Sequence, residues 1–233
     1  MLILGIESAT AQVGVALGSD EGVLASAHSA RDRRHAENLT PQIQFVTQQA
    51  RVELTKVSCI AVDVGPGMFT GLRVGLASAM ALAHGLGVPM IGISSLDIGA
   101  ATVENSSRTV TVCYDARRGE VFSAKYRRDP AGEMASVSDP RVSTPDDLAA
   151  DLADSSDEIL MVGDGVERYR EAFSGFAHIQ FARAGLMYPS ARTLVELAYP
   201  KAMREEFVSP NEIEPMYLRL PDAEINWKTR DGR

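Results

Sequence analysis

The stretch GPGMFTGLRVG, residues 65–75, has the composition most suggestive of ligand chemistry. It follows the apolar run CIAVDV and precedes a segment rich in Gly, Ala and Ser, so it joins a predicted strand to a predicted helix. Glycine-rich turns at such junctions can hold phosphate on backbone amides. However, a Walker A loop needs a lysine, and the dinucleotide fingerprint needs a third glycine where Thr70 stands. We therefore favour a tight turn that lets the helix approach closely, although Gly65 and Gly67 could still cradle an anion.

Metal binding and nucleophilic catalysis have less support. No two of the four histidines are three or four residues apart, the spacing that places two imidazoles on one helix face. A lone histidine such as His35, near a predicted helix start, is more often a cap or surface residue than a ligand. Cys59 and Cys113 lie in strand-like runs, have no histidine nearby in the sequence, and are expected to be buried reduced thiols. We predict no metal site and no catalytic residue.

Length and composition are those of an ordinary globular protein. The 233 residues suffice for one large domain or two lobes, and 45% are hydrophobic. A net charge of -8 argues against a stand-alone nucleic-acid clamp, which needs a basic surface. No apolar run approaches the roughly 18 residues of a membrane span, and MLILGIESAT lacks the basic flank of a signal peptide. We expect a cytoplasmic protein without membrane contact.

Apolar periodicity predicts an α/β order of three strands, helix, strand, helix, strand and helix in the first hundred residues. The predicted strands cover residues 1–7, 12–17, 22–28, 59–64 and 88–93, and the helices follow residue 35 and cover 71–86 and 94–103. A similar order partly repeats, with strands at 109–114, 120–126 and 158–162 and helices from Thr144, over 167–173 and over 189–203. The pattern predicts two lobes of related topology.

We place the lobe boundary near residue 100. Residues 1–100 form the predicted first lobe. Residues 101–233 form a second, smaller lobe that includes the C-terminal helix and a polar tail from Pro221, which is expected to be flexible.

Six short motifs, in order, resemble signatures of the TsaB (YeaZ) family. GPGMFTGLR is similar to the family's GPGSFTGLR, ILGIESAT to its opening strand and turn, and HAENLTP to its H-x-E-x-L-x-P helix start. ISSL, DARRGEVF and EPMYLR match three further signatures. Each match alone is weak. Together they run from residue 3 to residue 219 and are specific.

This resemblance implies a fold and a role. The fold would be the actin-like (ASKHA) architecture of sugar kinases, Hsp70 and actin, with two lobes built on βββαβαβα repeats. The role would be a non-catalytic dimerisation subunit that pairs with the larger paralogue TsaD and the ATPase TsaE. That machinery transfers a threonylcarbamoyl group to N6 of adenosine 37 in tRNAs that read codons starting with A. TsaD-like proteins hold a metal through H-x-x-x-H, where this chain has His35 and Leu39.

The alternatives to a non-catalytic subunit are two enzymes. One is an autonomous ATPase of the actin fold, and the other is a glycoprotease-like peptidase. Actin-like enzymes hold phosphate and magnesium with an aspartate and small residues after the first strand. Here that turn, residues 7–10, begins with the longer glutamate and has no glycine. The turn at 163–165 occupies an adenosine-loop position or is an ordinary strand-to-helix turn. The candidate anion-binding or nucleotide-binding residues are Glu7, Ser8, Gly65, Gly67, Gly163, Asp164 and Gly165. We expect the chain to have no cofactor of its own. Any ATP or ADP is expected to be shared at the interface with the partner.

In the family, two helices of the first lobe pack against their counterparts in TsaD. The resemblance therefore makes the helices after residues 35 and 70 a candidate partner interface. Its candidate residues are Leu39, Ile43, Val46, Met68, Phe69, Leu72, Arg73, Leu76 and Met80. These apolar stripes could instead face the chain's own sheet, as most do. Without TsaD, the same surface is expected to form a two-fold homodimer.

Contact with tRNA is expected to be indirect and left mostly to the partners. The turn DARRG places Arg117 and Arg118 where they could bind phosphate, a carboxylate or the partner, or remain solvated beside Asp115. The basic run KYRR, residues 125–128, adds at most a modest patch on an acidic chain.

Overall fold

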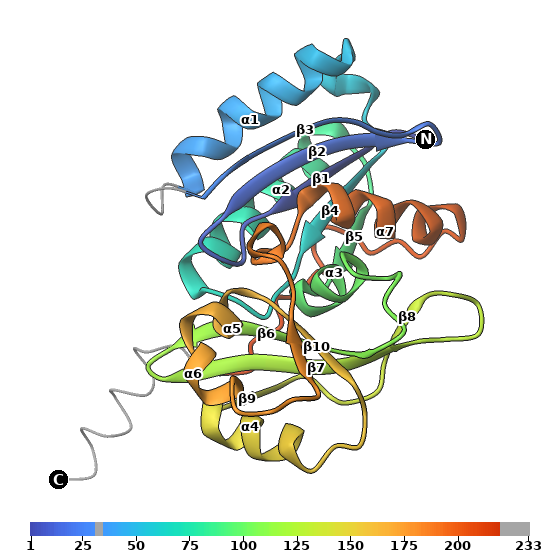
Figure 1. Cartoon of the computed structure of the whole chain (residues 1–233). Coiled ribbons are helices and arrows are strands. Elements are labelled where there is room, and N and C mark those ends of the chain that lie inside the picture. Colours follow the sequence, from blue (N-terminus) through green and yellow to red (C-terminus); the bar gives the residue numbers. More distant parts are fainter. Residues whose placement is uncertain (31–34, 220–233) are drawn as a thin grey trace, which may run out of the picture.

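The computed structural model describes residues 1–30 and 35–219, which form two sheets, one in each lobe (Figure 1). The first sheet has the order β3-β2-β1-β4-β5. Its strands are β1 (Ile3–Glu7), β2 (Val13–Ser19), β3 (Gly22–Ser29), β4 (Cys59–Asp63) and β5 (Met90–Ile93). β1 is antiparallel to β2 and parallel to β4, which is parallel to β5. The central strands are buried on both faces and therefore consist of continuous apolar runs.

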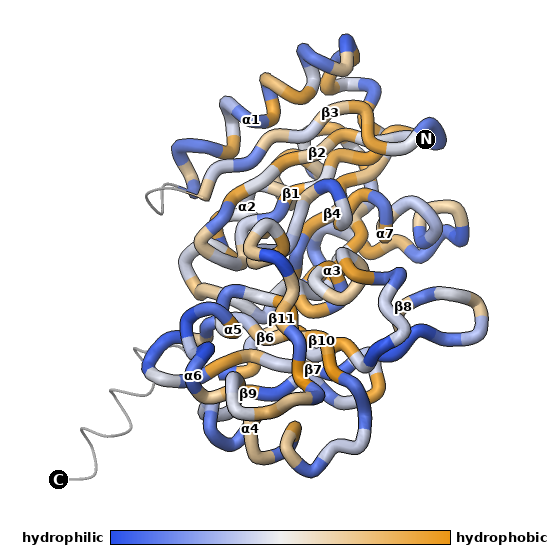
Figure 2. The backbone as a smooth tube through the Cα atoms, in the orientation of Figure 1, coloured by the Kyte–Doolittle hydropathy of each residue, from blue (hydrophilic) through white to orange (hydrophobic). Residues whose placement is uncertain are grey.

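Helices α1 (His35–Ala50) and α2 (Phe69–Leu86) cover one face of this sheet, and a short 3-10 turn, Leu54–Lys56, follows α1. Leu39 and Val46 of α1 pack with Leu76 of α2 against Leu4 and Ile6 of β1. In Figure 2 the strands are mostly apolar, whereas α1 alternates between polar and apolar residues along its length. α1 is therefore an amphipathic helix with one face on the sheet.

The second sheet has the order β11-β10-β6-β7-β8, with β9 also paired to β7. Its strands are β6 (Thr109–Arg117), β7 (Glu120–Arg128), β8 (Met134–Ser136), β9 (Arg141–Ser143), β10 (Ile159–Val162) and β11 (Ile179–Phe181). Helices α4 (Pro145–Ala153), α5 (Asp164–Arg168) and α6 (Arg170–Phe173) pack on one face, and a 3-10 turn, Ala184–Leu186, follows β11. We did not predict β8, β9 and β11, because three residues are too few to show a period.

The last helix of each repeat packs against the sheet of the other lobe. α3 (Ser95–Ala101) places Leu96 and Ala100 against the second sheet. α7 (Ala191–Met203) places Leu194 and Val195 against the first sheet, on the face opposite α1 and α2. Figure 1 shows α7 beside β4 and β5.

The packing of α7 corrects the predicted lobe boundary. We assigned this helix to residues 101–233 by its place in the chain, but its apolar side completes the core of the first lobe. The polar tail, predicted to be flexible, lies outside the described residues. The order βββαβαβα is confirmed in the first lobe. The second lobe repeats it with four strands, β6 to β9, in the place of three and with α5 and α6 in the place of one helix. No helix among residues 1–30 and 35–219 is both long and apolar enough to cross a membrane.

Candidate functional site

The glycine-rich loop packs against the turn that follows β1. The Met68 amide donates to the Ala9 carbonyl at 2.6 Å, and the Gly65 amide donates to the Asp63 carboxylate at 2.7 Å. Gly65 has φ 97°, a left-handed conformation that favours glycine. The amides of Gly65 and Met68 therefore already donate to acceptors within the protein.

Three glycines at intervals of four residues let α2 approach the turn after β1. A Cβ atom on Gly67 would lie 2.2 Å from the Ala9 carbonyl oxygen. On Gly71 it would lie 2.3 Å from the Ser8 carbonyl oxygen, and on Gly75 it would lie 2.0 Å from the Ser8 hydroxyl. That hydroxyl donates to the Gly71 carbonyl at 2.9 Å. The glycines therefore remove steric bulk where helix and turn meet.

Glu7 and Asp63 form a buried carboxyl pair behind the loop. The register of β1 on β4, with Ile6 opposite Val62, places the two acids side by side. Glu7 accepts from the Ala9 amide at 3.0 Å, and Asp63 accepts from the Ser95 hydroxyl at 2.7 Å. Burial raises the pKa of Asp63 to about 7. Burial, and then the charge of Asp63, raises the pKa of Glu7 well above its usual range.

This turn does not fit a phosphate group. The amides of Ala9, Gly65 and Met68, which could otherwise donate to phosphate, already have internal acceptors. Neither Glu7 nor Ser8 is exposed. The region is a packed junction between secondary-structure elements.

The Gly163-Asp164-Gly165 turn is also closely packed. Gly163 has φ 122°, and a Cβ atom there would lie 2.1 Å from the Cys113 carbonyl oxygen. Asp164 accepts from the Asp115 amide at 3.0 Å. Burial raises the pKa of Asp164 to about 6. These contacts join α5 to the end of β6.

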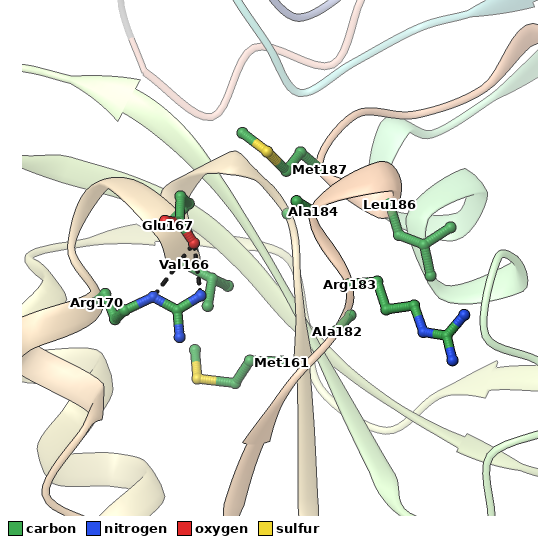
Figure 3. A pocket seen from close by; sticks show the side chains of 10 residues that line it. Met161, Val166, Glu167, Arg170, Ala182, Arg183, Ala184, Leu186 and Met187 are labelled. Carbon is green, nitrogen blue, oxygen red and sulfur yellow. Dashed lines mark hydrogen bonds and ion pairs between the residues drawn. The ribbon is translucent and has the colours of Figure 1, made fainter.

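A small pocket lies beside this turn, at the carboxyl ends of β10 and β11 (Figure 3). Met161, Val166 and Met187 supply apolar walls, and Arg170 pairs with Glu167 at 2.6 Å. The space that water can enter is about 10 Å³, enough for about one water molecule. An adenine ring does not fit there without rearrangement.

The histidine and cysteines are structural groups. His35 is buried, and its Nε2 lies 2.9 Å from the Thr10 carbonyl oxygen, so the expectation of a cap or surface residue was wrong. Burial raises the pKa of the Cys59 thiol to about 12 and also raises that of Cys113, which disfavours the reactive thiolates. Among the described residues, no three His, Cys, Asp or Glu side chains group closely enough to hold a metal ion.

Part of the predicted partner interface faces inward. Four of its leucine and valine residues lie inside the protein, where a partner cannot reach them without unfolding the first lobe. They are Leu39, Val46, Leu72 and Leu76. This corrects the prediction: the strongest apolar stripes of α1 and α2 cover the chain's own sheet, because burying them there stabilises the lobe.

The other predicted interface residues lie nearer the surface. Ile43 and Met80 are half-buried at the edge of the same core, Met68 and Phe69 are half-buried at the start of α2, and Arg73 is exposed.

The exposed side of α1 and α2 is poor in charge. Their sequences contain only two charged side chains, Glu37 and Arg73, in a protein that is 23% charged. Phe45, absent from the predicted interface, is 49% exposed on α1, and Ala77 and Ala81 are exposed on α2. Phe45 could have been found from the sequence, because it is an aromatic residue within the polar run around residues 44–49. We call these exposed sides the outer face.

The DARRG hairpin lies where the two lobes meet. Arg117 and Arg118 both have positive φ, 65° and 56°. Arg117 pairs with Asp115 at 3.0 Å and donates to the Met68 sulfur at 3.5 Å, so it connects the second lobe to the glycine-rich loop. Asp115 also pairs with Arg168 at 3.5 Å. In the KYRR run, Arg127 pairs with an aspartate, which reduces the positive charge of that patch.

Comparison with known proteins decides the family. The family model described as "TsaD: tRNA N6-adenosine threonylcarbamoyltransferase" matches residues 23–227. The TsaB protein of Escherichia coli K12, named for tRNA threonylcarbamoyladenosine biosynthesis, is 30% identical over 235 residues, with both chains fully covered. This chain belongs to the TsaB (YeaZ) family.

Solved structures agree with that assignment. YeaZ from Pseudomonas aeruginosa superposes with a TM-score of 0.82 and 27% identity, covering 93% of this chain and 99% of that one. Among the relatives found by sequence, the TsaB protein of Bacillus subtilis is 26% identical, and the match covers 97% of this chain and 98% of that protein. EutJ of Carboxydothermus hydrogenoformans, at 12% identity and a TM-score of 0.53, shares the fold alone. The actin-like fold predicted for the TsaB family is confirmed, as is a role in tRNA threonylcarbamoyladenosine biosynthesis.

Proposed function

We propose that this chain is a non-catalytic scaffold subunit that docks a TsaD-like catalytic paralogue on the outer face of α1 and α2. With a TsaE-like ATPase, the assembly transfers a threonylcarbamoyl group to N6 of adenosine 37 in tRNAs that read codons starting with A. ATP or ADP is bound chiefly by the partners, and tRNA contacts this chain only indirectly. Without the paralogue, the same face forms a two-fold homodimer in the cytoplasm.

The observation that carries this proposal is the low charge of the outer face. The buried centres of protein interfaces are depleted of charged residues and enriched in aromatic ones. Two helices with Glu37 and Arg73 as their only charges, and with Phe45 half exposed, match that composition. The exposed residues Ala77 and Ala81 of α2 have small side chains, which leaves room for another helix to pack closely.

The packed interior argues against the two enzymatic alternatives. An ATPase needs phosphate-binding amides, and those of Ala9, Gly65 and Met68 have internal acceptors. A cysteine peptidase needs a thiolate, and burial raises the pKa of the Cys59 and Cys113 thiols.

Reconstitution tests the proposal. Purified chain, TsaD-like paralogue and TsaE-like ATPase should modify tRNA together, and omission of this chain should abolish that activity. Phe45→Glu and Ala81→Glu should each weaken binding to the paralogue by about 30-fold or more, because each buries a charge at the interface.

The matched control is Met203→Glu at the end of α7, where the side chain is 60% exposed. It adds the same charge away from the outer face and should bind normally. Full tRNA modification without this chain, or ATP or peptide turnover by the chain alone, would exclude the scaffold function.

A further inference from the structure

Arg73, the cation of the outer face, is held in a fixed position. Its guanidinium carbon lies 3.7 Å from the centroid of the Phe69 ring, one turn earlier on α2. Its Nε donates to the Tyr217 hydroxyl at 3.0 Å. The Phe69 and Tyr217 rings pack at 5.4 Å between centroids. An exposed arginine is usually mobile, and these contacts reduce the entropy that it would lose on binding.

Tyr217 reaches this position through the C-terminal segment, residues 207–219, which we call the strap. Ile213 is buried in the core under α1 and α2. The Met216 amide donates to the Val64 carbonyl at 2.7 Å, directly before the glycine-rich loop. Arg219 then pairs with Glu120 of β7 at 2.8 Å. The strap is therefore fixed on both sides of Tyr217.

Arg73 has no acidic partner among residues 1–30 and 35–219. Its interactions within this part of the chain are the Tyr217 hydroxyl and the two aromatic rings. Other exposed arginines, such as Arg192 with Glu196 at 3.0 Å, do pair with a carboxylate. Within the described part of the chain, the terminal nitrogens of Arg73 thus remain as donors beside an apolar aromatic surface.

We propose that Arg73 anchors the docking face by binding an Asp or Glu carboxylate on a helix of the catalytic paralogue. The inference rests on the proposed function and adds the chemistry of the contact. The terminal nitrogens take the carboxylate end-on, while Phe69 and Tyr217 form the apolar walls that exclude water. Tyr217 is a positioning residue, since it acts through Arg73.

A protein carboxylate suits this site better than an RNA phosphate. Nucleic-acid backbones are bound by several cations together, and salt-dependent affinity grows with their number. On the outer face Arg73 is followed by the exposed alanines 77 and 81 and by no second lysine or arginine of α2. One cation on a low-charge helical surface fits a single acidic side chain of another helix.

The test measures the affinity of the full chain for purified TsaD-like paralogue by titration calorimetry at two salt concentrations. Arg73→Glu should weaken binding by about 100-fold, because it places two like charges together. Arg73→Lys should weaken it by about 10-fold, since lysine cannot bind end-on through two nitrogens. Tyr217→Phe keeps the ring and removes the hydroxyl, and should weaken binding by about 5-fold.

The control is Arg192→Glu, the same charge reversal on α7, which covers the opposite face of the first sheet. It should bind like wild type, and melting temperatures should show that all variants fold. Rising salt should weaken the wild type more than Arg73→Glu. Reversal of one acidic residue of the paralogue to lysine should restore binding to Arg73→Glu and identify the carboxylate.

Three outcomes would overturn the inference. If the wild-type chain fails to bind the paralogue, the proposed function itself is rejected. Normal binding by Arg73→Glu, with Ala81→Glu impaired, keeps the docking face and rejects the anchor. Normal paralogue binding by Arg73→Glu with reduced tRNA affinity assigns the arginine to RNA instead.

Discussion

At the scale of single residues, the most constrained groups are the buried acids Glu7 and Asp63. Each has one oxygen hydrogen-bonded, whereas Glu7 Oε2 and Asp63 Oδ2 have no partner among the described residues. Two neighbouring carboxylates without a cation disfavour full ionisation. The pair therefore couples the stability of the first lobe to pH.

We expect the free energy of unfolding to fall as the pH rises from about 4 to about 7. Asp63 has a pKa of about 7 in the folded protein, against about 3.9 when unfolded. The folded state therefore holds the proton more tightly in this window, and each unit of rising pH favours unfolding until Asp63 has ionised.

Asp63→Asn should flatten this slope and stabilise the protein at pH 8. An asparagine oxygen can still accept from Gly65 and Ser95, and its amide can donate to Glu7. Urea unfolding at pH 5, 6, 7 and 8 measures the effect, with the exposed Asp20→Asn as control. An unchanged slope in Asp63→Asn would mean that Asp63 ionises normally in the folded protein.

At the scale of elements, the contact between α2 and the turn after β1 decides how the outer face is presented. Gly67, Gly71 and Gly75 bring the backbone of α2 against Ser8 and Ala9. The tight turn that we favoured from the sequence is present. What α2 approaches, however, is the turn after the first strand, about 60 residues earlier in the chain.

Gly71→Ala should destabilise the protein by about 1–3 kcal/mol, because its methyl group would meet the rigid Ser8 carbonyl oxygen. Gly85→Ala, in the last turn of the same helix, is the matched control. No atom lies within 4 Å of its Cβ position, so alanine should stabilise the helix by about 0.5–1 kcal/mol. Chemical denaturation of both variants checks the pair. Equal effects would show that helix propensity, not the contact with Ser8, governs position 71.

At the scale of the whole molecule, the exchange of α3 and α7 makes the lobes depend on each other. The first sheet is covered on one face by a helix from the end of the chain, and the second by a helix from residues 95–101. The strap adds the Arg219–Glu120 pair between the lobes. Neither half of the chain therefore contains a complete core.

Leu194→Ala should destabilise both lobes together. Leu194 is fully buried against the first sheet, and its truncation should cost about 2–5 kcal/mol. Hydrogen exchange should then accelerate in β1 and equally in β6 of the other lobe, as expected for one cooperative unit. Loss of protection in β1 alone would show that the lobes unfold independently.

The sequence by itself determined the local elements and the family. Apolar runs gave β1, β4 and β6, helical spacing gave α1 and α2, and six motifs placed the chain in the TsaB family. These are properties of neighbours along the chain, where periodicity and turn chemistry act directly.

Tertiary structure alone decided which surfaces are free. Leu39 and Phe45 are both apolar residues of one helix, yet the first is buried and the second half exposed. The path of α7 to the opposite lobe and the meeting of Tyr217 with Arg73 involve segments far apart in the sequence. Side-chain burial depends on what packs across the helix, and that partner comes from elsewhere in the chain.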